Sequence, residues 1–497
     1  MTGIDLCEAS PVVRKLTDEQ EAILRQQPDQ NVIVEAAAGA GKTSTLVEYA
    51  NKYRGHKGLY IVFSADAAKE ANNRLPPHVR ARTAHSYAHR ALGVSRFSDR
   101  LRQRLRRNDI RLAGIDLKSD YLPPDRLMRA ILNGLTNFCN DAGTQLLPRH
   151  CGLEKAPAMV QSRSLPQIAA VVKRFLDYEN SGLPFTHDMY LKKLEMHGTI
   201  GDVADYLLLD EAQDLNPVLI SLVQKSKKPA IIVGDPKQSI YAFRGAVNAF
   251  DSFDGPRFPL SQSWRYGPEV AAIANYIFSF SEKPMAHPVR GHPDRETKIE
   301  VYGGQVPARA FVLARTNARL FEGLVKVQVP FFVAGGFDTL AKQLLSAWAL
   351  SQNDQFNVTD SYVRSFAQWE DLCDEAEEDD PDAKRLVRMV AEYGSQIPAI
   401  IERLRSLQRP HPQDAHILLS TAHKAKGLEA DTVVICDDFE TPAEMYAKLT
   451  DEQIGRVAFE QELNLLYVAL SRPRYRLILP ASLYGAAMTA LAAHLKN

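Results

Sequence analysis

The sequence has no long apolar run, little cysteine and no net charge, and each absence excludes a class of protein. No stretch approaches the roughly 18 continuous apolar residues of a membrane-spanning helix, so no membrane span is expected. The five cysteines among 497 residues are scattered and form no C-x-x-C pair, which predicts reduced thiols without a zinc or iron–sulfur site. Cys139, His150 and Cys151 are better explained as buried or incidental residues than as metal ligands. The N-terminal stretch lacks the features of an export signal.

Charge is balanced overall and uneven locally. The chain has 60 basic residues (lysine plus arginine) and 60 acidic residues (aspartate plus glutamate). The net charge therefore does not indicate a partner that carries phosphates, and any basic surface is local. Residues 96–111 contain seven arginines, which suit a phosphate backbone as well as a solvated helix face. Residues 370–382 are strongly acidic, and a solvated loop or helix end explains them best.

Short apolar runs alternate with helical periodicity along most of the chain, which is typical of doubly wound parallel α/β sheets. The runs fall into two groups, so we expect two such sheets. The expected buried strands are residues 31–34, 59–63, 206–209, 230–233, 311–314, 432–436 and 475–479. Long stretches with few strand signals separate these runs and predict helical insertions.

The segment AAAGAGKTS, residues 36–44, lies between an expected strand and an expected helix. It matches the phosphate-binding pattern G-x-x-x-x-G-K-[ST] except at its first position, which is Ala36. Backbone N–H groups at such a helix N-terminus bind phosphate, while Lys42 reaches the outer phosphates and the Thr43 hydroxyl binds Mg²⁺. The predicted nucleotide-binding residues of this loop are Ala38, Gly39, Ala40, Gly41, Lys42, Thr43 and Ser44.

Two adjacent carboxylates, Asp210 and Glu211, follow the apolar run 206–209. Carboxylates at the end of a strand downstream of a P-loop suit Mg²⁺-assisted hydrolysis of a nucleotide. We expect Asp210 to hold Mg²⁺ together with Thr43, and Glu211 to orient and deprotonate the attacking water. Gln213 is expected to sense the γ-phosphate. A merely negative turn is the alternative, which the strand and the P-loop disfavour.

The segments DEAQD (210–214) and GDPKQSIYAFRGA (234–246) resemble superfamily 1A DNA helicases of the UvrD, Rep and PcrA type. Further motifs follow in the order of that family over nearly the whole chain: LTDEQEAIL (16–24), VFSADAAKEANNRL (62–75), TAHS (83–86), SQSWRYGPEVA (261–271), LARTN (313–317), LLSTAHKAKGLEADTVVI (418–435) and ELNLLYVALSRP (462–473). Three segments, PFTHDMYLKKLE (184–195), FRGAVNAF (243–250) and NLLYVALSR (464–472), are most similar to the helicase core of the F-box DNA helicases and their bacterial or phage counterparts. No F-box segment precedes Leu16, so ubiquitin-ligase function is not expected.

The resemblance implies two RecA-like domains, 1A and 2A, with helical insertions 1B and 2B. The boundaries that we predict are 1–90 and 189–258 for 1A, 91–188 for 1B, 259–340 and 410–497 for 2A, and 341–409 for 2B. The predicted 2B is shorter than is usual in the family, which leaves processivity and autoregulation open. Almost no sequence is left for a fused nuclease.

The resemblance also implies roles for individual residues. Gln20 reads the adenine edge, because an amide offers a donor and an acceptor. Trp264 stacks on adenine where the family usually has tyrosine, and Glu429 contacts the ribose. Further implied roles are the γ-phosphate contacts of Arg265 and Arg472 from the second sheet and the link from γ-phosphate to DNA at Gln238. The implied DNA contacts are Ser64, His85, Ser86, Tyr241, Phe243, Arg244, Thr421 and His423, with Tyr241 and Phe243 as stacking platforms; the family often has tryptophan in place of Phe243.

The expected function is therefore an ATP-dependent 3′→5′ DNA helicase and single-stranded DNA translocase that uses ATP and Mg²⁺. Its expected partners are single-stranded DNA and junctions with duplex, bound by a monomer, in repair, recombination or replication. Two alternatives are a translocase that strips proteins from single strands with weak unwinding, and a non-hydrolysing DNA-binding scaffold. We expect a nucleoid-associated cytoplasmic location in a bacterium or phage, or a nuclear one in a eukaryote, and no secretion.

Overall fold

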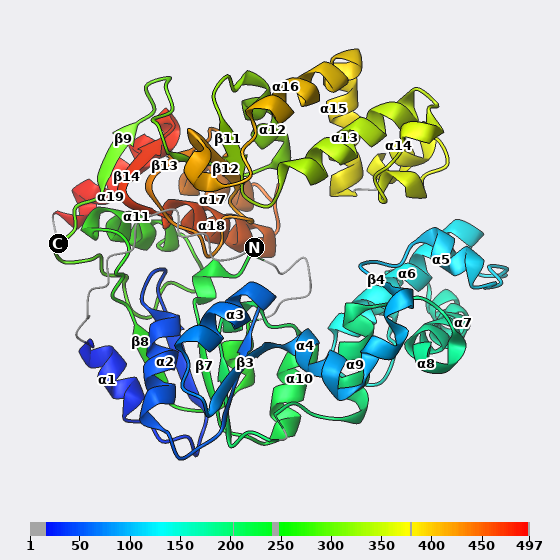
Figure 1. Cartoon of the computed structure of the whole chain (residues 1–497), viewed down its shortest axis with the longest axis horizontal. Coiled ribbons are helices and arrows are strands. Elements are labelled where there is room, and N and C mark those ends of the chain that lie inside the picture. The colour runs from blue at the N-terminus through cyan, green and yellow to red at the C-terminus, as the bar shows by residue number, and fades with distance from the viewer. Residues whose placement is uncertain (1–15, 202, 241–247, 378–379, 496–497) are drawn as a thin grey trace. The chain divides into compact units, whose positions relative to one another are not determined.

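The computed structural model describes residues 16–201, 203–240, 248–377 and 380–495 (Figure 1). Contacts divide the chain into two compact units, which are described one at a time. The N-terminal unit comprises Lys15–Ala36 and Gly41–Leu260, and the C-terminal unit comprises Ala37–Ala40 and Ser261–Asn497. Three of the predicted DNA contacts, Tyr241, Phe243 and Arg244, lie outside the described residues.

In the described part of the N-terminal unit, six strands form one parallel sheet in the order β3-β2-β6-β7-β1-β8. The strands are β1 (Val32–Ala36), β2 (Gly58–Val62), β3 (Val79–Thr83), β6 (Tyr206–Leu209), β7 (Ala230–Gly234) and β8 (Arg257–Leu260). The inner strands β2, β6 and β7 are buried at every residue. Such continuously apolar strands are expected in a parallel sheet whose two faces are both covered.

Several helices of the N-terminal unit begin at side chains that cap them. Ser64, Thr83 and Asn216 each accept a hydrogen bond from the backbone N–H three residues further on, which satisfies a donor that the helix leaves unpaired. The helices of the unit are α1 (Asp18–Leu24), α2 (Lys42–Lys52), α3 (Ala65–Arg74), α4 (Ala84–Ala91), α5 (Arg107–Leu112), α6 (Pro124–Asn140), α7 (Ala158–Leu176), α8 (Tyr178–Ser181), α9 (His187–His197) and α10 (Pro217–Ser226).

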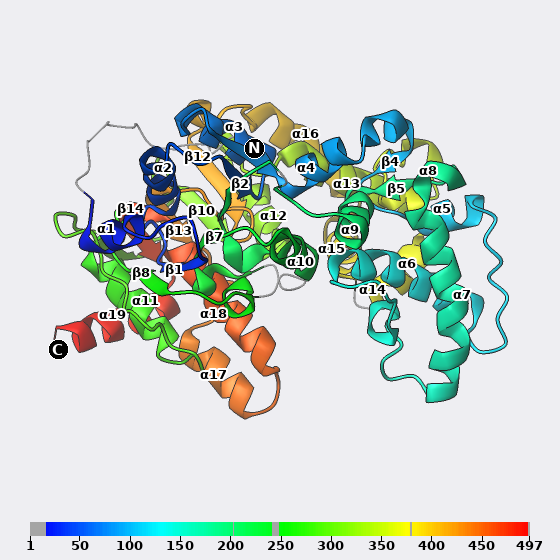
Figure 2. The same ribbon diagram turned by 90° about the horizontal axis from the view of Figure 1, so that it is seen from below.

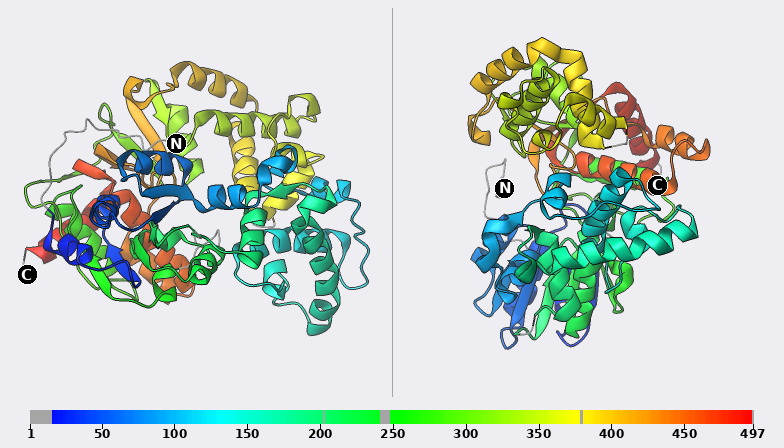
Figure 3. Two further views of the ribbon diagram at one scale, coloured as in Figure 1. Left: turned by 60° about the horizontal axis from the view of Figure 1, so that its bottom comes forward. Right: turned by 90° about the vertical axis from the view of Figure 1, so that its right-hand side faces the viewer.

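Between α4 and β6 the chain leaves the sheet and forms a mainly helical insertion (Figures 2 and 3). Its two short strands, β4 (Leu101–Arg102) and β5 (Phe185–Thr186), pair only with each other in the described structure. The long helix α6 buries Leu127, Ile131, Leu135 and Phe138, a spacing that forms one apolar stripe. Helix α9 packs against both α6 and α10 and lies between them (Figures 1 and 2).

The described part of the C-terminal unit has a second parallel sheet of six strands in the order β11-β12-β10-β13-β14-β9. The strands are β9 (Lys298–Val301), β10 (Phe311–Ala314), β11 (Phe331–Val333), β12 (Ile417–Thr421), β13 (Ala430–Ile435) and β14 (Pro473–Leu479). The helices are α11 (Pro268–Phe278), α12 (Asn317–Lys326), α13 (Phe337–Ser351), α14 (Trp369–Glu377), α15 (Pro381–Tyr393), α16 (Ile397–Leu407), α17 (Pro442–Thr450), α18 (Arg456–Leu470) and α19 (Ala481–His494). Helices α13 to α16 share one apolar core with β10, β11 and β12.

The two predicted parallel sheets are confirmed, and each of the seven predicted apolar runs overlaps a strand of the structure. Five strands of these two sheets were not predicted, namely β3, β8, β9, β11 and β12, and neither was the short pair β4 and β5. Four of them, β3, β8, β9 and β11, form the outer edges of the sheets. An edge strand has only one neighbour and keeps exposed polar residues, such as Arg80 in β3 and Lys298 in β9. A search for continuous apolar runs therefore misses edge strands.

None of the helices in the described residues is long and apolar enough to cross a membrane.

Candidate functional site

Several of the side chains predicted to bind nucleotide and DNA lie along one edge of the N-terminal sheet. Because the six described strands are parallel, their carboxyl ends lie at the same edge, where α/β proteins bind ligands. There β1 leads into the P-loop, β6 into Asp210 and Glu211, and β7 into Asp235. The strands β2 and β3 lead into Ser64 and His85. The strand order thus separates the predicted nucleotide groups from the predicted DNA groups along this edge.

Helix α2 begins behind the P-loop with an N-terminus that no side chain caps. Its first flanking residue, Gly41, has a left-handed backbone with φ of 80°, which costs a residue with a Cβ roughly 1–2 kcal/mol. The uncapped N–H groups of the first turn and the helix dipole both favour an anion at this position. The last two residues of the pattern, Lys42 and Thr43, open the helix. The chain here fits the phosphates of a nucleotide.

Asp210, which follows β6, binds two hydroxyl groups from other elements. Its Oδ2 accepts hydrogen bonds from the Thr43 hydroxyl at 3.1 Å and from the Tyr60 hydroxyl at 2.6 Å. Burial and the charge of Glu211 raise the pKa of Asp210 above its ordinary value, while the charge of Lys42 lowers it. A cation bound here would therefore favour the ionised carboxylate. Tyr60 was not predicted to take part, because nothing in its local sequence signals the contact.

The oxygen atoms of Thr43 and Asp210 are hard donors of the kind that Mg²⁺ prefers. Within the described residues, no group of three or more histidine, cysteine, aspartate or glutamate side chains could hold a metal ion. Mg²⁺ commonly takes one or two protein ligands and completes its shell with water and phosphate oxygens. The donor set therefore fits Mg²⁺ that arrives with a nucleotide.

Glu211 has a backbone conformation that is uncommon outside glycine, with φ of 53° and ψ of 44°. Residues held in such conformations cluster at active sites. The Glu211 carboxylate accepts a hydrogen bond from the Gln213 amide and lies 3.8 Å from the Lys42 ammonium. Its side chain is 31% exposed, so water can reach it. This position suits a group that orients and deprotonates water.

A chain of hydrogen bonds runs from Glu211 to Gln238. The Gln213 amide donates to Glu211 and accepts at Oε1 from the Asp235 backbone N–H at 2.9 Å. The Asp235 carboxylate in turn accepts from the Gln238 amide at 2.6 Å. Asp235 is 1% exposed. Burial raises the pKa of its carboxyl group above the ordinary value, although the positive charge of Lys42 acts to lower that pKa. Asp235 is not among the predicted site residues, although it is an acidic residue directly behind the strand β7.

Gln20 caps helix α1 and contacts the P-loop helix. Its amide oxygen accepts from the Thr17 N–H at 3.0 Å, and its amide nitrogen donates to the Thr45 hydroxyl at 3.0 Å. A glutamine amide has two donor hydrogens and two acceptor positions, so one of each remains after these bonds. The predicted adenine contact of Gln20 stays a prediction. Ser44, the last predicted residue of the loop, is exposed and accepts from Arg74 at 3.1 Å.

Within the C-terminal unit, the P-loop residues Ala38 and Gly39 make two backbone hydrogen bonds. The Ala38 N–H donates to the Tyr467 hydroxyl at 2.9 Å, and the Gly39 carbonyl accepts from the Trp264 N–H at 2.9 Å. Ala40 is 2% exposed. The Trp264 ring meets the His292 ring edge-on, with 5.4 Å between the centroids. The adenine stack on Trp264 stays a prediction.

Arg265, Glu429 and Arg474 form an ion-paired group in the C-terminal unit. Arg265 Nε donates to Glu429 Oε2 at 2.5 Å, and Arg474 Nε donates to Glu429 Oε1 at 3.0 Å. Burial disfavours the charge of Glu429, but the two arginines outweigh it and lower the pKa of Glu429 to about 2. Glu429 therefore holds Arg265 in place, and its predicted ribose contact stays a prediction. Arg474 is a site neighbour that the motifs did not identify.

Arg472 is 1% exposed and its guanidinium is committed to protein acceptors. It donates to the Val468 carbonyl at 2.7 Å, the Leu428 carbonyl at 3.1 Å and the Ser471 hydroxyl at 2.9 Å. Burial, followed by the positive charge of Arg265, lowers the pKa of Arg472 to about 9. The structure thus brings the two predicted γ-phosphate arginines near one another, while their contact with phosphate stays a prediction.

The described DNA-contact candidates lie at the ends of strands in both units. In the N-terminal unit, Ser64 caps α3 and Ser86 is exposed in the first turn of α4. In the C-terminal unit, Thr421 ends β12 at 4% exposure, and His423 is partly exposed in the turn that follows. Next to Ser64, the ring of Phe63 is 59% exposed. Phe63 is a stacking candidate that was not predicted, because the sequence analysis took it as the last residue of the buried strand 59–63, whereas β2 ends at Val62.

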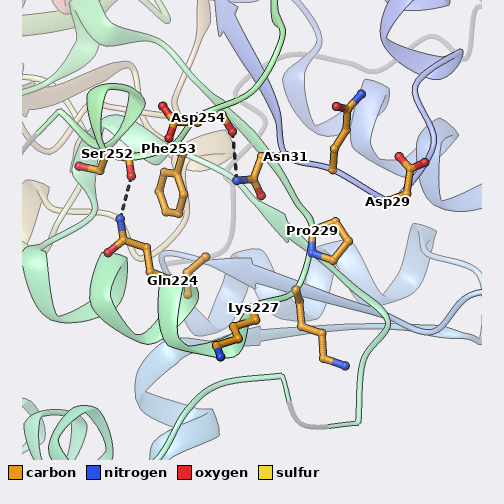
Figure 4. A pocket seen from close by; sticks show the side chains of 11 residues that line it. Asp29, Asn31, Gln224, Lys227, Pro229, Ser252, Phe253 and Asp254 are labelled. Atoms are coloured by element: carbon orange, nitrogen blue, oxygen red, sulfur yellow. Dashed lines mark hydrogen bonds between the residues drawn. The ribbon is translucent and has the colours of Figure 1, made fainter.

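A pocket of about 400 Å³ lies elsewhere on the N-terminal unit (Figure 4). Its wall includes the Asn31 amide, which donates to the Asp254 carbonyl at 3.2 Å, and the Gln224 amide, which donates to the Ser252 carbonyl at 2.7 Å. Asn31 directly precedes β1, whereas the P-loop follows β1. The pocket is therefore at the amino edge of the sheet, opposite the predicted nucleotide groups.

Two family models match the chain. The UvrD/REP helicase N-terminal domain matches residues 16–254, and the UvrD-like helicase C-terminal domain matches residues 336–484. Together they cover eight of the twelve strands that form the two described sheets, and all of the predicted site residues except Trp264 and Arg265.

Curated proteins of the same kind are similar over most of the chain. F-box DNA helicase 1 of Gallus gallus is 29% identical over 94% of this chain and 49% of its own length. F-box DNA helicase protein 1 of Schizosaccharomyces pombe is 28% identical over 94% of this chain and 58% of its own length. ATP-dependent DNA helicase UvrD2 of Mycobacterium tuberculosis is 24% identical over 95% of this chain and 79% of its own length. The chain spans about half the length of the two F-box relatives.

Proposed function

The chain belongs to the UvrD-like DNA helicases of superfamily 1A, and from this premise we propose that it is an ATP-dependent helicase that moves 3′→5′ along single-stranded DNA. One observation carries the proposal. Lys42, Thr43, Asp210 and Glu211 come from α2 and from the end of β6, and they contact one another at the carboxyl edge of one sheet. These four side chains fit ATP as the substrate, bound together with Mg²⁺.

Each of these side chains has a different role in the proposed hydrolysis of ATP. Bound MgATP supplies the phosphoanhydride bond whose cleavage releases the driving free energy. Lys42 and the N–H groups of α2 would balance the phosphate charge, and Thr43 with Asp210 would hold Mg²⁺. Glu211 accepts a proton from water, and Gln213 fixes the orientation of the Glu211 carboxylate through their hydrogen bond. Positive charge from Arg265 and Arg472 stabilises the transferring phosphoryl group.

Movement along DNA needs a link from the nucleotide to the strand. The hydrogen bonds from Glu211 through Gln213 and Asp235 to Gln238 support such a link, because Gln238 stands three residues before Tyr241. A shift of Gln213 upon loss of the γ-phosphate would disturb the bonds to Asp235 and then those to Gln238. We propose that this relay couples hydrolysis to the grip on single-stranded DNA, in repair, recombination or replication.

Replacing Lys42 by alanine tests the nucleotide site. We expect turnover of ATP in the presence of single-stranded DNA to fall by about 10²–10³-fold, because a preorganised charge that stabilises the transition state is lost. The measurement is steady-state ATPase activity with and without oligo(dT). Lys173→Ala, at an exposed position on α7, is the matched control and should behave as the wild type. A Lys42→Ala variant with wild-type turnover would refute the assignment of the P-loop.

Polarity and unwinding require a separate measurement. We expect a labelled duplex with a 3′ single-stranded tail to be unwound with ATP, and the same duplex with a 5′ tail to stay intact. A protein bound to single-stranded DNA serves as a second substrate. Displacement of that protein without unwinding would favour a stripping translocase, and preference for the 5′ tail would refute the proposed direction.

A further inference from the structure

The segment THDMY, residues 186–190, has no role in the function proposed so far. It ends the helical insertion and forms the first turn of α9. Helix α9 packs against α4 (Figure 1), and α4 carries the predicted DNA contact His85 in its first turn. Ala84 and Ala88 of α4 share one buried core with Tyr190 of α9. The segment therefore lies directly against a predicted DNA-binding element.

His85 and Asp188 form a hydrogen-bonded pair across the two helices. His85 Nε2 lies 3.1 Å from Asp188 Oδ1, and the two side chains are 40% and 42% exposed. The bond made by one ring nitrogen decides which tautomer the imidazole adopts and how the ring is oriented. With Nε2–H held by the carboxylate, Nδ1 is the ring nitrogen left to face a ligand at this surface.

The ring of Tyr190 packs against the ring of His85. Its ring meets the ring of His85 edge-on at 6.1 Å and that of His89 at 5.9 Å, and its hydroxyl is 2.8 Å from His187 Nδ1. Burial raises the pKa of Tyr190 to about 12, and burial followed by the charge of His85 lowers the pKa of His187. Tyr190 and His187 are therefore neutral at neutral pH, and they form a fixed wall behind the His85 ring.

An exposed pair of polar side chains such as His85 and Asp188 contributes little to folding stability. A contribution to stability therefore does not explain why these two residues are paired. A carboxylate that accepts from one ring nitrogen fixes the tautomer and orientation of a histidine, an arrangement that is common where histidine binds a metal ion and that orients the ring toward any ligand. Ser86, another predicted DNA contact, is exposed beside His85 in the first turn of α4, where its N–H and hydroxyl donate to Thr83.

We propose that Asp188 is a positioning residue that orients His85 toward single-stranded DNA. The inference rests on the proposed function, because it assumes that the carboxyl edge near β2 and β3 lies along the DNA. Asp188 acts through His85 and makes no contact with DNA itself. The segment THDMY thus becomes part of the DNA site rather than a mere end of the insertion.

The test measures binding of fluorescein-labelled oligo(dT) by anisotropy for the full chain and its variants. We expect Asp188→Ala to raise the Kd by about three- to tenfold, the size of one lost hydrogen bond. Asp188→Asn keeps an acceptor oxygen and should recover part of the affinity. In the His85→Ala background, Asp188→Ala should have no further effect, because its target is gone. Asp205→Ala, which removes a carboxylate at the amino end of β6, is the charge-matched control and should leave the Kd unchanged.

ATPase assays separate positioning from a general structural defect. The oligo(dT) concentration for half-maximal stimulation should rise with the Kd for Asp188→Ala, while the maximal rate stays within about twofold of the wild type. A wild-type Kd for Asp188→Ala, or an effect that adds to that of His85→Ala, overturns this inference alone. Absence of oligo(dT) binding by the wild type overturns the proposed function and this inference with it.

Discussion

Replacing Glu211 by glutamine will lower DNA-stimulated ATP turnover by about 10²–10⁴-fold, the usual contribution of a general base. The amide has the same shape as the carboxylate but takes no proton from water. It can still bond with Gln213, so the surrounding structure has no cause to change. Loss of a negative charge beside Lys42 also removes a competitor for that ammonium. ATP binding should therefore survive or become tighter.

The measurement pairs steady-state ATPase activity with equilibrium binding of a fluorescent ATP analogue. Glu48→Gln is the matched control, because Glu48 is exposed on the same P-loop helix, α2, and its loss should alter neither quantity. Turnover by Glu211→Gln at the wild-type rate would show that another group activates water. Loss of binding together with turnover would instead mean that Glu211 holds the site together.

Replacing Glu195 by leucine will destabilise the N-terminal unit by about 3–5 kcal/mol, the cost of leaving a buried charge without its partner. The Lys192 and Glu195 side chains are both 0% exposed and lie 3.0 Å apart. Lys192 also donates to the Asp141 carbonyl at 2.7 Å. On the other side, Glu195 accepts from the Ser221 hydroxyl at 2.7 Å and from the Lys225 ammonium at 2.6 Å. The group joins α9 to the end of α6 and to α10.

Glu179→Leu is the matched control, because Glu179 pairs with Lys193 at 2.8 Å while 34% exposed. A surface pair of this kind contributes about 0–1 kcal/mol. Denaturation followed by circular dichroism, with hydrogen exchange of α9 and α10, measures the loss. The three tryptophans, Trp264, Trp348 and Trp369, belong to the C-terminal unit, so the tryptophan-detected transition is an internal reference. Equal stability of Glu195→Leu and Glu179→Leu would contradict the prediction.

The same group makes the N-terminal unit sensitive to acid. Burial disfavours the charge of Glu195, but Lys225, Ser221 and Lys192 outweigh it and lower the pKa of Glu195 below its ordinary value of 4.5. An acid whose pKa is lower in the folded state stabilises that state above the unfolded pKa. This contribution is fully present above about pH 5 and is lost as the pH falls through the lowered value. Glu195→Leu should therefore flatten the acid limb of the stability profile.

The signals that led to the proposed nucleotide site are local. The P-loop is a run of nine residues, and the carboxylates Asp210 and Glu211 stand next to each other behind a fully buried strand. Continuous apolar runs located all of the inner strands except β12, since a strand that is buried on both faces is apolar at nearly every residue. Edge strands lack a continuous apolar run, so the sequence analysis missed them.

The partners of these residues were not predictable in the same way. Tyr60 donates to Asp210, which is 150 residues away in the sequence, and Glu429 pairs with Arg265 across 164 residues. Nothing in either local sequence marks such a meeting. It depends on which strands become neighbours, here β2 with β6 in one sheet, and on how the following turns aim their side chains.

The sequence by itself therefore determined the chemistry of this protein: the phosphate loop, the paired carboxylates, the two parallel sheets and the family. Short-range patterns suffice for these, because a loop and a strand need only their own residues. Only the tertiary structure decided that Asp188 meets His85 and that Lys192 and Glu195 are buried together. These contacts occur where α9 packs against α4 and α10, and such long-range packing is set by the whole core rather than by any segment of it.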